Sequence, residues 1–202
     1  MHPNRAFGWE DRQAMLDFVA ERGFAHIFTA DMDGVFVAHA PIVVTEDGRV
    51  QFHVARRNRA AGQFAGSPVL ISVSGRDAYH SANWYASPDQ VPTWLYEAVE
   101  IEGDARQLSE TELIAQVDRL TEVMDRRWSP ESPWTRAKMS PGKFESMLKA
   151  IVGFEVEPRA IRGTRKFNQH KSAADVAASI EGQQGAGRAD IAAAIRGAAP
   201  SK

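Results

Sequence analysis

Residues 24–54 read FAHIFTADMDGVFVAHAPIVVTEDGRVQFHV, and this stretch decides the fold. Three runs rich in β-branched and aromatic residues, 24–30, 35–44 and 49–54, are separated by the turn sequences DMDG and TEDG. An Asp-Gly pair between apolar runs favours a hairpin, because glycine readily adopts the positive φ that a tight turn needs. The sequence therefore predicts a meander of three antiparallel strands.

Strand and helix patterns continue on both sides of the meander. The clearest helix covers 109–127, where Ser109 and Glu112 form a capping box before apolar residues at helical spacing. The other expected elements are helices over 11–22, 57–65 and 144–151, and strands over 68–74, 91–108 and 152–167. About six strands, mostly antiparallel, predict a mainly β fold with α additions, built as a small β-barrel.

Length and composition indicate one globular domain with a short appended element. The chain has 202 residues, of which 44% are hydrophobic and 25% are charged. We expect the domain to span 1–171 and an alanine-rich helical tail to span 172–202. A glycine-rich break at 182–187 divides the tail, so we expect one or two short helices there, weakly anchored or frayed.

Composition also excludes several classes of site. The chain has no cysteine, which excludes disulfides, zinc–thiolate sites, iron–sulfur clusters and cysteine nucleophiles. The six histidines form no HxH or HxxxH pair, so no metal site is expected. The net charge of −2 does not indicate nucleic-acid binding, although a local basic patch could still bind nucleic acid. No apolar run is long enough to span a bilayer, so we expect a cytoplasmic protein with no membrane partner.

Two basic and polar clusters stand at the ends of expected strands. The sequence has no P-loop, no Gly-x-Gly-x-x-Gly and no Gly-x-Ser-x-Gly motif. Any phosphate would therefore have to be bound by side chains instead of by a glycine-rich loop. The first cluster, HVARRNR at 53–59, offers guanidiniums and an amide. The second, RGTRKFNQHK at 162–171, is either a solvated rim or a nucleic-acid contact.

The stretch GRDAYHSANWY at 75–85 is expected to be a loop after a buried strand. It combines large aromatic rings with small hydrogen-bonding groups. Such a lining suits a flat ligand with polar edges. It also suits a packed loop whose Tyr and Trp tips find backbone partners.

Short motifs in a fixed order give the chain a family resemblance from the strand at Phe24 to Asp175. It resembles the PaiB-type FMN-binding negative transcriptional regulators. The matching pieces are HAP at 39–41, HVARRN at 53–58, AYxSxxWY at 78–85, VPTWxY at 91–96, MLKAIVGFE at 147–155 and KxxQ at 166–169. The chain departs from the usual family pattern at Arg76, Asn83, Leu95 and His170; at Leu95 the family usually has Asn.

This resemblance implies a split β-barrel like that of the pyridoxamine phosphate oxidases, with FMN as cofactor. It also implies a homodimer with FMN in clefts at the subunit interface. The cofactor-binding residues implied are His39 beside the flavin, Arg56 and Asn58 on the phosphate side, Tyr79, Ser81 and Trp84 lining the cleft, and Lys166 and Gln169 closing it.

Three functions remain open from the sequence. The first is an FMN-binding negative regulator of transcription, with DNA as a partner of the 162–171 cluster. The second is an FMN-dependent flavin reductase or oxidoreductase that uses a nicotinamide or other small-molecule reductant, or a haem-binding barrel that uses His39 or His170. The third is a cofactor-free dimeric barrel that acts through protein contacts. The sequence assigns no catalytic residue.

Overall fold

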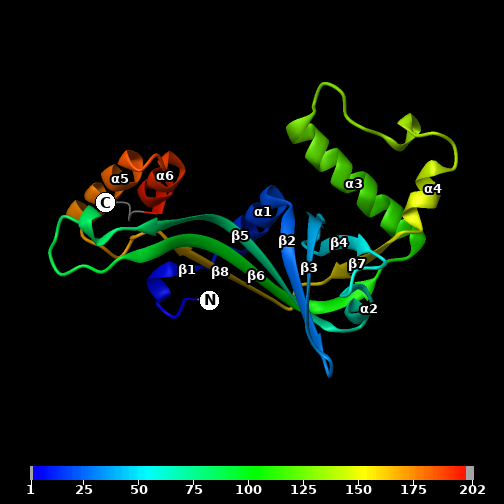
Figure 1. Ribbon diagram of the computed structural model, residues 1–202, viewed down its shortest axis with the longest axis horizontal. Coiled ribbons are helices and arrows are strands. Elements are labelled where there is room, and N and C mark those ends of the chain that lie inside the picture. The colour runs from blue at the N-terminus through cyan, green and yellow to red at the C-terminus, as the bar shows by residue number, and fades with distance from the viewer. Residues whose placement is uncertain (1, 199–202) are drawn as a thin grey trace. The chain divides into compact units, whose positions relative to one another are not determined.

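The expected meander is present in the structure. The computed structural model describes residues 2–198 (Figure 1). Strands β2 (Phe24–Asp31), β3 (Gly34–Val44) and β4 (Val50–Ala55) follow one another as antiparallel neighbours. At the DMDG turn Asp31 lies opposite Gly34, whose φ of 128° is a conformation that side chains rarely adopt.

Three further strands close the meander into a barrel. These are β5 (Pro68–His80), β6 (Thr93–Gln107) and β7 (Ile151–Val156). The strands follow the order β6-β5-β2-β3-β4-β7, and a second pairing joins β7 back to β6. In that closing pairing Ala105 lies opposite Val156. The predicted mainly β fold, with a small barrel and helical additions, is confirmed.

Aromatic rings fill the inside of this barrel. The side chains of Phe52, Phe64 and Phe154 are buried, and each pair of ring centroids is 5.3 Å apart. Strand residues alternate between this core and the outer face, as the period of two requires. In β4 the residues Phe52 and Val54 point inward, whereas His53 lies on the outer side and is only partly buried.

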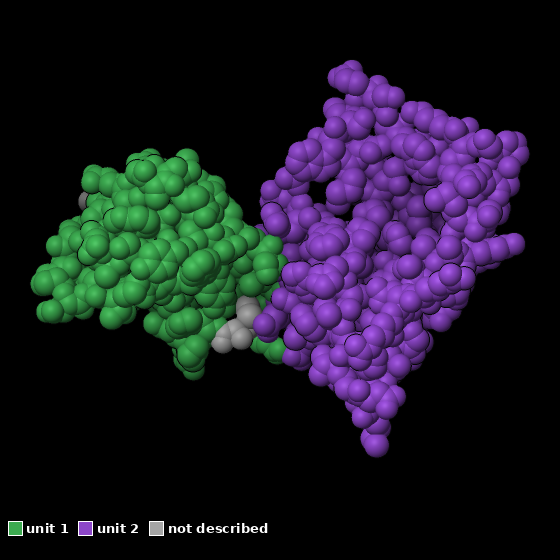
Figure 2. Space-filling view, viewed as in Figure 1, with its two compact units in different colours: residues 1–11, 74–99, 162–202 green, residues 12–73, 100–161 purple. Residues whose placement is uncertain are grey.

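The described residues fall into two compact units (Figure 2). Unit 2 contains 12–73 and 100–161, and with them the barrel. Unit 1 contains the described parts of 1–11, 74–99 and 162–202. Strands β5 and β6 begin in one unit and end in the other.

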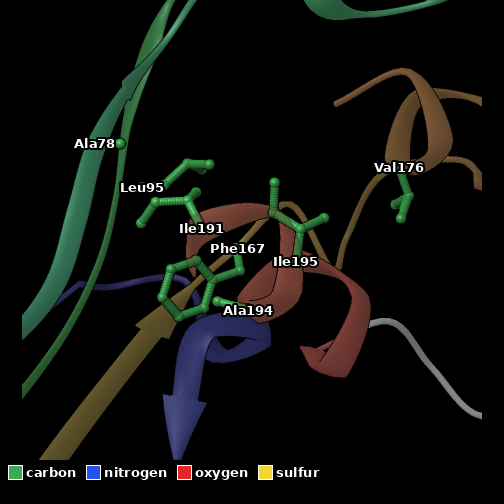
Figure 3. Close-up of a cluster of buried hydrophobic side chains, with 7 residues drawn as sticks. All are labelled: Ala78, Leu95, Phe167, Val176, Ile191, Ala194 and Ile195. Atoms are coloured by element: carbon green, nitrogen blue, oxygen red, sulfur yellow. The ribbon is translucent and has the colours of Figure 1, made fainter. Parts of the chain in front are cut away.

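The alanine-rich tail is firmly anchored in unit 1, against the expectation of weak anchoring. It forms α5 (Ala173–Gly185) and α6 (Ala189–Ala198). Figure 3 shows Ile191 and Ile195 of α6 beside Leu95 of β6 and Phe167, and all four are almost fully buried. The small side chains of the alanines allow the helices to approach the sheet closely. The apolar core between helices and sheet is built from these few large residues. The residues of the tail beyond 198 lie outside the described part of the chain.

Two predictions of strand boundaries were wrong. The stretch expected as a loop from residue 75 continues β5 as far as His80, because β6 supplies a neighbouring strand along this length. The single strand expected over 152–167 is two strands, β7 and β8 (Ala160–Lys166). Pro158 lies between them and cannot donate a backbone hydrogen bond. A two-residue strand, β1 (Gly8–Trp9), pairs with β8 and has no recognisable sequence pattern.

The helices mostly match the expectations. Ser109 and Glu112 form the predicted capping box of α3, although α2 is shorter than the expected 57–65. Among residues 2–198 no helix combines the length and the apolar character needed to cross a membrane. The remaining elements are α1 (Arg12–Arg22), α2 (Ala61–Phe64), α3 (Glu110–Trp128) and α4 (Lys143–Leu148), with short 3₁₀ segments η1 (Arg5–Phe7), η2 (Ala82–Trp84) and η3 (Arg136–Lys138).

Barrel closure requires glycine at position 103. A Cβ at Gly103 would lie 2.4 Å from the carbonyl oxygen of Glu157, a backbone atom that cannot rotate away. We expect Gly103→Ala to lower the free energy of unfolding by about 2 kcal/mol, measured by urea denaturation. Gly62→Ala is the control, because nothing lies within 4 Å of its added Cβ. Equal stability of the two variants would contradict this account of the closure.

Candidate functional site

The eight predicted cofactor-binding residues are divided between the two units. Each set is therefore described within its own unit. Unit 2 holds His39, Arg56 and Asn58, and unit 1 holds Tyr79, Ser81, Trp84, Lys166 and Gln169.

In unit 2 the outer face of β2, β3 and β5 is an open surface. Along β3 the side chains of Val35, Val37 and His39 are exposed, whereas Phe36 and Ala38 between them are buried. The exposed fractions of Val35 and Val37 are 69% and 43%, high for apolar residues of a barrel strand. This face offers an apolar surface beside a histidine, which suits a flat aromatic ligand.

His39 has a partner that the sequence analysis missed. His26 of β2 lies opposite His39, and the two imidazole centroids are 4.7 Å apart in an edge-to-face arrangement. Ser72 of β5 lies opposite His26 on its other side. The hairpin register contained the signal, because a turn that places Asp31 opposite Gly34 also places residue 26 opposite residue 39.

The turn after β4 carries the basic cluster of unit 2. Arg56 donates from Nε to the carbonyl oxygen of Lys149 at 3.2 Å and from Nη2 to that of Ile151 at 2.9 Å. Asn58 accepts a hydrogen bond from the backbone N–H of Ala60 at 2.9 Å. Both predicted residues therefore also stabilise local structure: Arg56 ties the turn to the start of β7, and Asn58 shapes the turn.

The same turn has the donors that a phosphate needs. The guanidinium of Arg59 lies 4.7 Å from the ring centroid of Phe36, which places the turn against β3. Arg57 is exposed, and no acidic group among residues 2–198 pairs with it. Three guanidiniums and one amide within the four residues 56–59 match the charge and the acceptors of a phosphate. The residues present thus fit the phosphate end of FMN.

In unit 1 most of the predicted site residues take part in local packing. Ser81 accepts a hydrogen bond from the backbone N–H of Asn83 and caps η2. Trp84 packs against α5 so closely that a Cβ at Gly182 would lie 2.4 Å from its Cγ. Lys166 donates to the hydroxyl oxygen of Thr93 at 2.7 Å. These contacts explain why the residues are present, and their roles toward a cofactor stay predictions.

Gln169 and Tyr79 complete the unit 1 set. Gln169 accepts a hydrogen bond from the N–H of Phe167 and donates to the carbonyl oxygen of Ala6. Tyr79 is half exposed, and its ring centroid is 6.3 Å from that of Trp94, which is also half exposed. Trp94 was not predicted as a site residue, although it lies in the VPTWxY motif. Leu95 is fully buried under α6, so this departure from the family pattern serves the apolar core.

A buried polar network fixes the segment that carries Tyr79, Ser81 and Trp84. Gln183 of α5 donates from Nε2 to the carbonyl oxygen of Tyr79 at 3.0 Å and to Nδ1 of His80 at 3.1 Å. The other ring nitrogen of His80 therefore carries the proton and donates to the Ser179 hydroxyl at 3.1 Å. His80 has no exposed surface, and its burial, aided by the charge of Lys171, lowers its pKa to about 4.

The basic cluster at 162–171 is largely engaged inside unit 1. The guanidinium of Arg165 lies 3.4 Å from the ring centroid of Trp9, and its Nε is 3.5 Å from a carboxylate oxygen of the buried Glu97. Lys171 donates to the side-chain oxygen of Gln90 at 2.6 Å. Arg162 and His170 are the exposed members of the cluster.

Comparisons with known proteins agree with these features. Residues 1–160 match the model of a family described as "Putative FMN-binding domain". The chain is 29% identical over 185 residues to Protease synthase and sporulation protein PAI 2 of Bacillus subtilis strain 168, which covers 90% of this chain and 88% of that protein.

Solved structures establish the fold. The FAD and haem binding protein of Mycobacterium smegmatis is similar with a TM-score of 0.59 at 13% identity, over 79% of this chain and 73% of that chain. Flavocytochrome Anf3 of Azotobacter vinelandii is similar with a TM-score of 0.61 at 12% identity, over 82% of this chain and 72% of that chain. The predicted split barrel is thereby confirmed.

The low pKa of His80 predicts a loss of stability in mild acid. The unfolded chain takes up a proton at the ordinary histidine pKa of 6.5, whereas the folded chain resists it down to about 4. The stabilisation is therefore complete above pH 6.5 and is lost as the pH falls toward 4. Between pH 7.5 and 4.5 we expect the wild type to lose about 2 kcal/mol more than His80→Gln in urea unfolding. If the free energies of unfolding of the wild type and His80→Gln changed in parallel with pH, the low pKa assigned to His80 would be contradicted.

Proposed function

This chain belongs to the family of FMN-binding domains that includes the PaiB-type proteins, its cofactor is FMN, and we propose that it acts as a flavin-dependent negative regulator of transcription in the cytoplasm. The Bacillus subtilis relative carries the name Protease synthase and sporulation protein PAI 2. The similarity extends over most of both chains, so the whole domain is shared rather than a single motif.

The observation that carries FMN binding is the set of donors in the basic turn 56–59, of which Arg57 is exposed. The contact of Arg59 with Phe36 places this turn against the first residues of β3, although Phe36 faces the core and His39 faces the opposite, outer side of that strand. We propose that Arg57, aided by Arg56 and Asn58, holds the phosphate. The flavin ring would then lie on the outer face of β2 and β3, beside His39.

Bound FMN supplies reversible electron transfer. The protein's own residues bind and orient the ring system. The exposed Val35 and Val37 give it an apolar surface, and the His26–His39 pair offers hydrogen-bonding nitrogens at the edge of that surface. One barrel leaves this face open, so a second copy of the chain is the proposed cover that excludes water from the flavin.

DNA is the proposed partner of the regulator. Arg162 and His170 are exposed members of the 162–171 cluster and would contact phosphates of the duplex. Arg162, Arg165 and Lys171 already have partners, and burial together with the charges of Lys171 and Lys166 lowers the pKa of His170, so we expect few phosphate contacts and a moderate salt dependence.

The proposed phosphate site can be tested by comparing the binding of FMN with that of riboflavin, which lacks the phosphate. We expect Arg57→Ala to weaken FMN binding about tenfold, the effect of one lost charge-assisted hydrogen bond, and to leave riboflavin binding unchanged. We expect His39→Ala to weaken both ligands equally. The measurement is quenching of flavin fluorescence during titration.

Arg22→Ala is the matched control, because Arg22 is an exposed arginine elsewhere in unit 2. It should bind both flavins like the wild type. An equal loss of FMN and riboflavin in Arg57→Ala, or no loss of either, would overturn the proposed phosphate site.

Duplex DNA and NADPH separate the regulator from an enzyme. We expect the FMN-loaded protein to bind fluorescently labelled duplex DNA, with affinity that falls as salt rises. Arg162→Gln should weaken that binding, and Arg196→Gln on the exposed side of α6 should not. Anaerobic bleaching of the flavin by NADPH, without DNA binding at low salt, would instead support the flavin oxidoreductase.

A further inference from the structure

A hollow between α3 and the loop that follows it takes no part in the proposed flavin site. Its volume is about 910 Å³, and small-molecule sites usually measure about 300–1,000 Å³. The loop arches away from α3, and the surface of unit 2 is hollowed in the same region (Figures 1 and 2). One wall is a stripe of α3 whose members recur at helical spacing: Asp118, Thr121, Glu122 and Arg126. The other wall is the loop, through Pro130 and residues 133–137.

Several contacts hold the loop in this open shape. Residues 129–142 join α3 to α4, and loops of more than about 12 residues in a compact domain are usually functional or disordered. The three prolines of this loop each have a fixed φ. The backbone N–H of Trp134 donates to a carboxylate oxygen of Asp125, and Nζ of Lys138 donates to the carbonyl oxygen of Pro133 at 2.8 Å. The hollow is therefore preformed, which lowers the entropy that a ligand would lose on binding.

The loop wall offers an aromatic ring with an unused donor. Trp134 lines the hollow together with Pro130, Pro133 and Ala137, and 37% of its surface is exposed. Its indole N–H has no hydrogen-bond partner among residues 2–198. An indole gives a flat ligand a large apolar contact area, and its N–H can bind an acceptor atom on the edge of that ligand.

The charges in the hollow cancel one another. Arg126 contacts Glu122 at 2.6 Å, and Arg136 contacts Asp118 at 2.8 Å. Each guanidinium in the hollow is thus already paired with a carboxylate, and the lining has no net charge. A phosphate or carboxylate ligand would have to compete with these carboxylates for the guanidiniums. The lining therefore favours an uncharged ligand.

We propose that this hollow is a second ligand site of the chain and that it binds a flat, uncharged aromatic molecule. The ring of the ligand packs against Trp134 and the two prolines, and an acceptor on its edge binds the indole N–H. None of the residues that line the hollow is among those proposed to hold FMN. Occupancy of the hollow therefore requires neither FMN nor DNA.

Two fluorescent probes of related structure test the site. N-Phenyl-1-naphthylamine is uncharged, and 8-anilinonaphthalene-1-sulfonate has the same rings with an added sulfonate. In fluorescence titrations we expect the wild type to bind the uncharged probe at least fivefold more tightly than the sulfonate. Trp134→Ala removes the aromatic wall, and Ala137→Phe fills the hollow from an exposed position. Each should weaken binding of the uncharged probe at least fivefold.

Two control variants separate the hollow from other apolar surfaces. Trp128→Ala removes a neighbouring tryptophan that is 73% exposed and does not line the hollow. Val37→Asp places a charge on the proposed flavin face. Both should change binding of the uncharged probe less than twofold. No binding by the wild type, an equal loss in Trp128→Ala and Trp134→Ala, a loss confined to Val37→Asp, or tighter binding of the sulfonate overturns the proposal.

Trypsin provides a second readout of the same site. Arg136 and Lys138 are exposed cleavage positions in the loop. A ligand held between α3 and the loop stabilises the closed form of this segment and slows its local opening. We expect a saturating amount of the uncharged probe to slow cleavage after these residues at least threefold in the wild type but not in Ala137→Phe. Equal protection in both proteins, or no protection of the wild type, overturns the proposal.

Discussion

The pairing of β7 with β6 is the contact on which the barrel depends. Without it the meander would end in an unpaired edge, and the phenylalanines on its inner face would have no closed space to fill. With it, every strand of the ring has two neighbours. The close approach of the backbone at Glu157 to β6 leaves room only for glycine at position 103.

Closure also divides the outer surface into a covered part and an open part. Helix α3 covers β4, where Nδ1 of His53 is 2.9 Å from the side-chain oxygen of Gln116 and burial lowers the pKa of His53. Among residues 2–198 no such cover lies over His39 on β3, and its side chain is exposed. Two histidines on adjacent strands therefore have different roles: His53 is part of the packing under a helix, and His39 is available to a ligand.

The barrel could be predicted from the sequence because the turns and the helix start that shape it depend on residues close together in the chain. Asp-Gly turns fix the hairpins, and the Ser109–Glu112 capping box fixes the start of α3. The length of β5 and the anchoring of the tail depend instead on partners distant in the sequence. The alternation of apolar and polar residues therefore did not reveal how far β5 extends, and the alanine content did not reveal that the tail is anchored. The same limit applies to the site. The sequence identified Arg56 and Trp84 as polar or aromatic candidates, but not that each is engaged in local structure.

The two hydrogen bonds of Arg56 have a consequence for how a ligand and the barrel influence each other. The guanidinium grips backbone carbonyls at Lys149 and Ile151, at the point where the last barrel strand begins. The basic turn and the start of β7 therefore cannot loosen independently, whereas the pairing of β7 with β6 lies further along that strand, at residues 154–156. An anion that immobilises the turn would also hold the start of β7 against β4, so occupancy would be detected as slower fraying and slower proteolysis there.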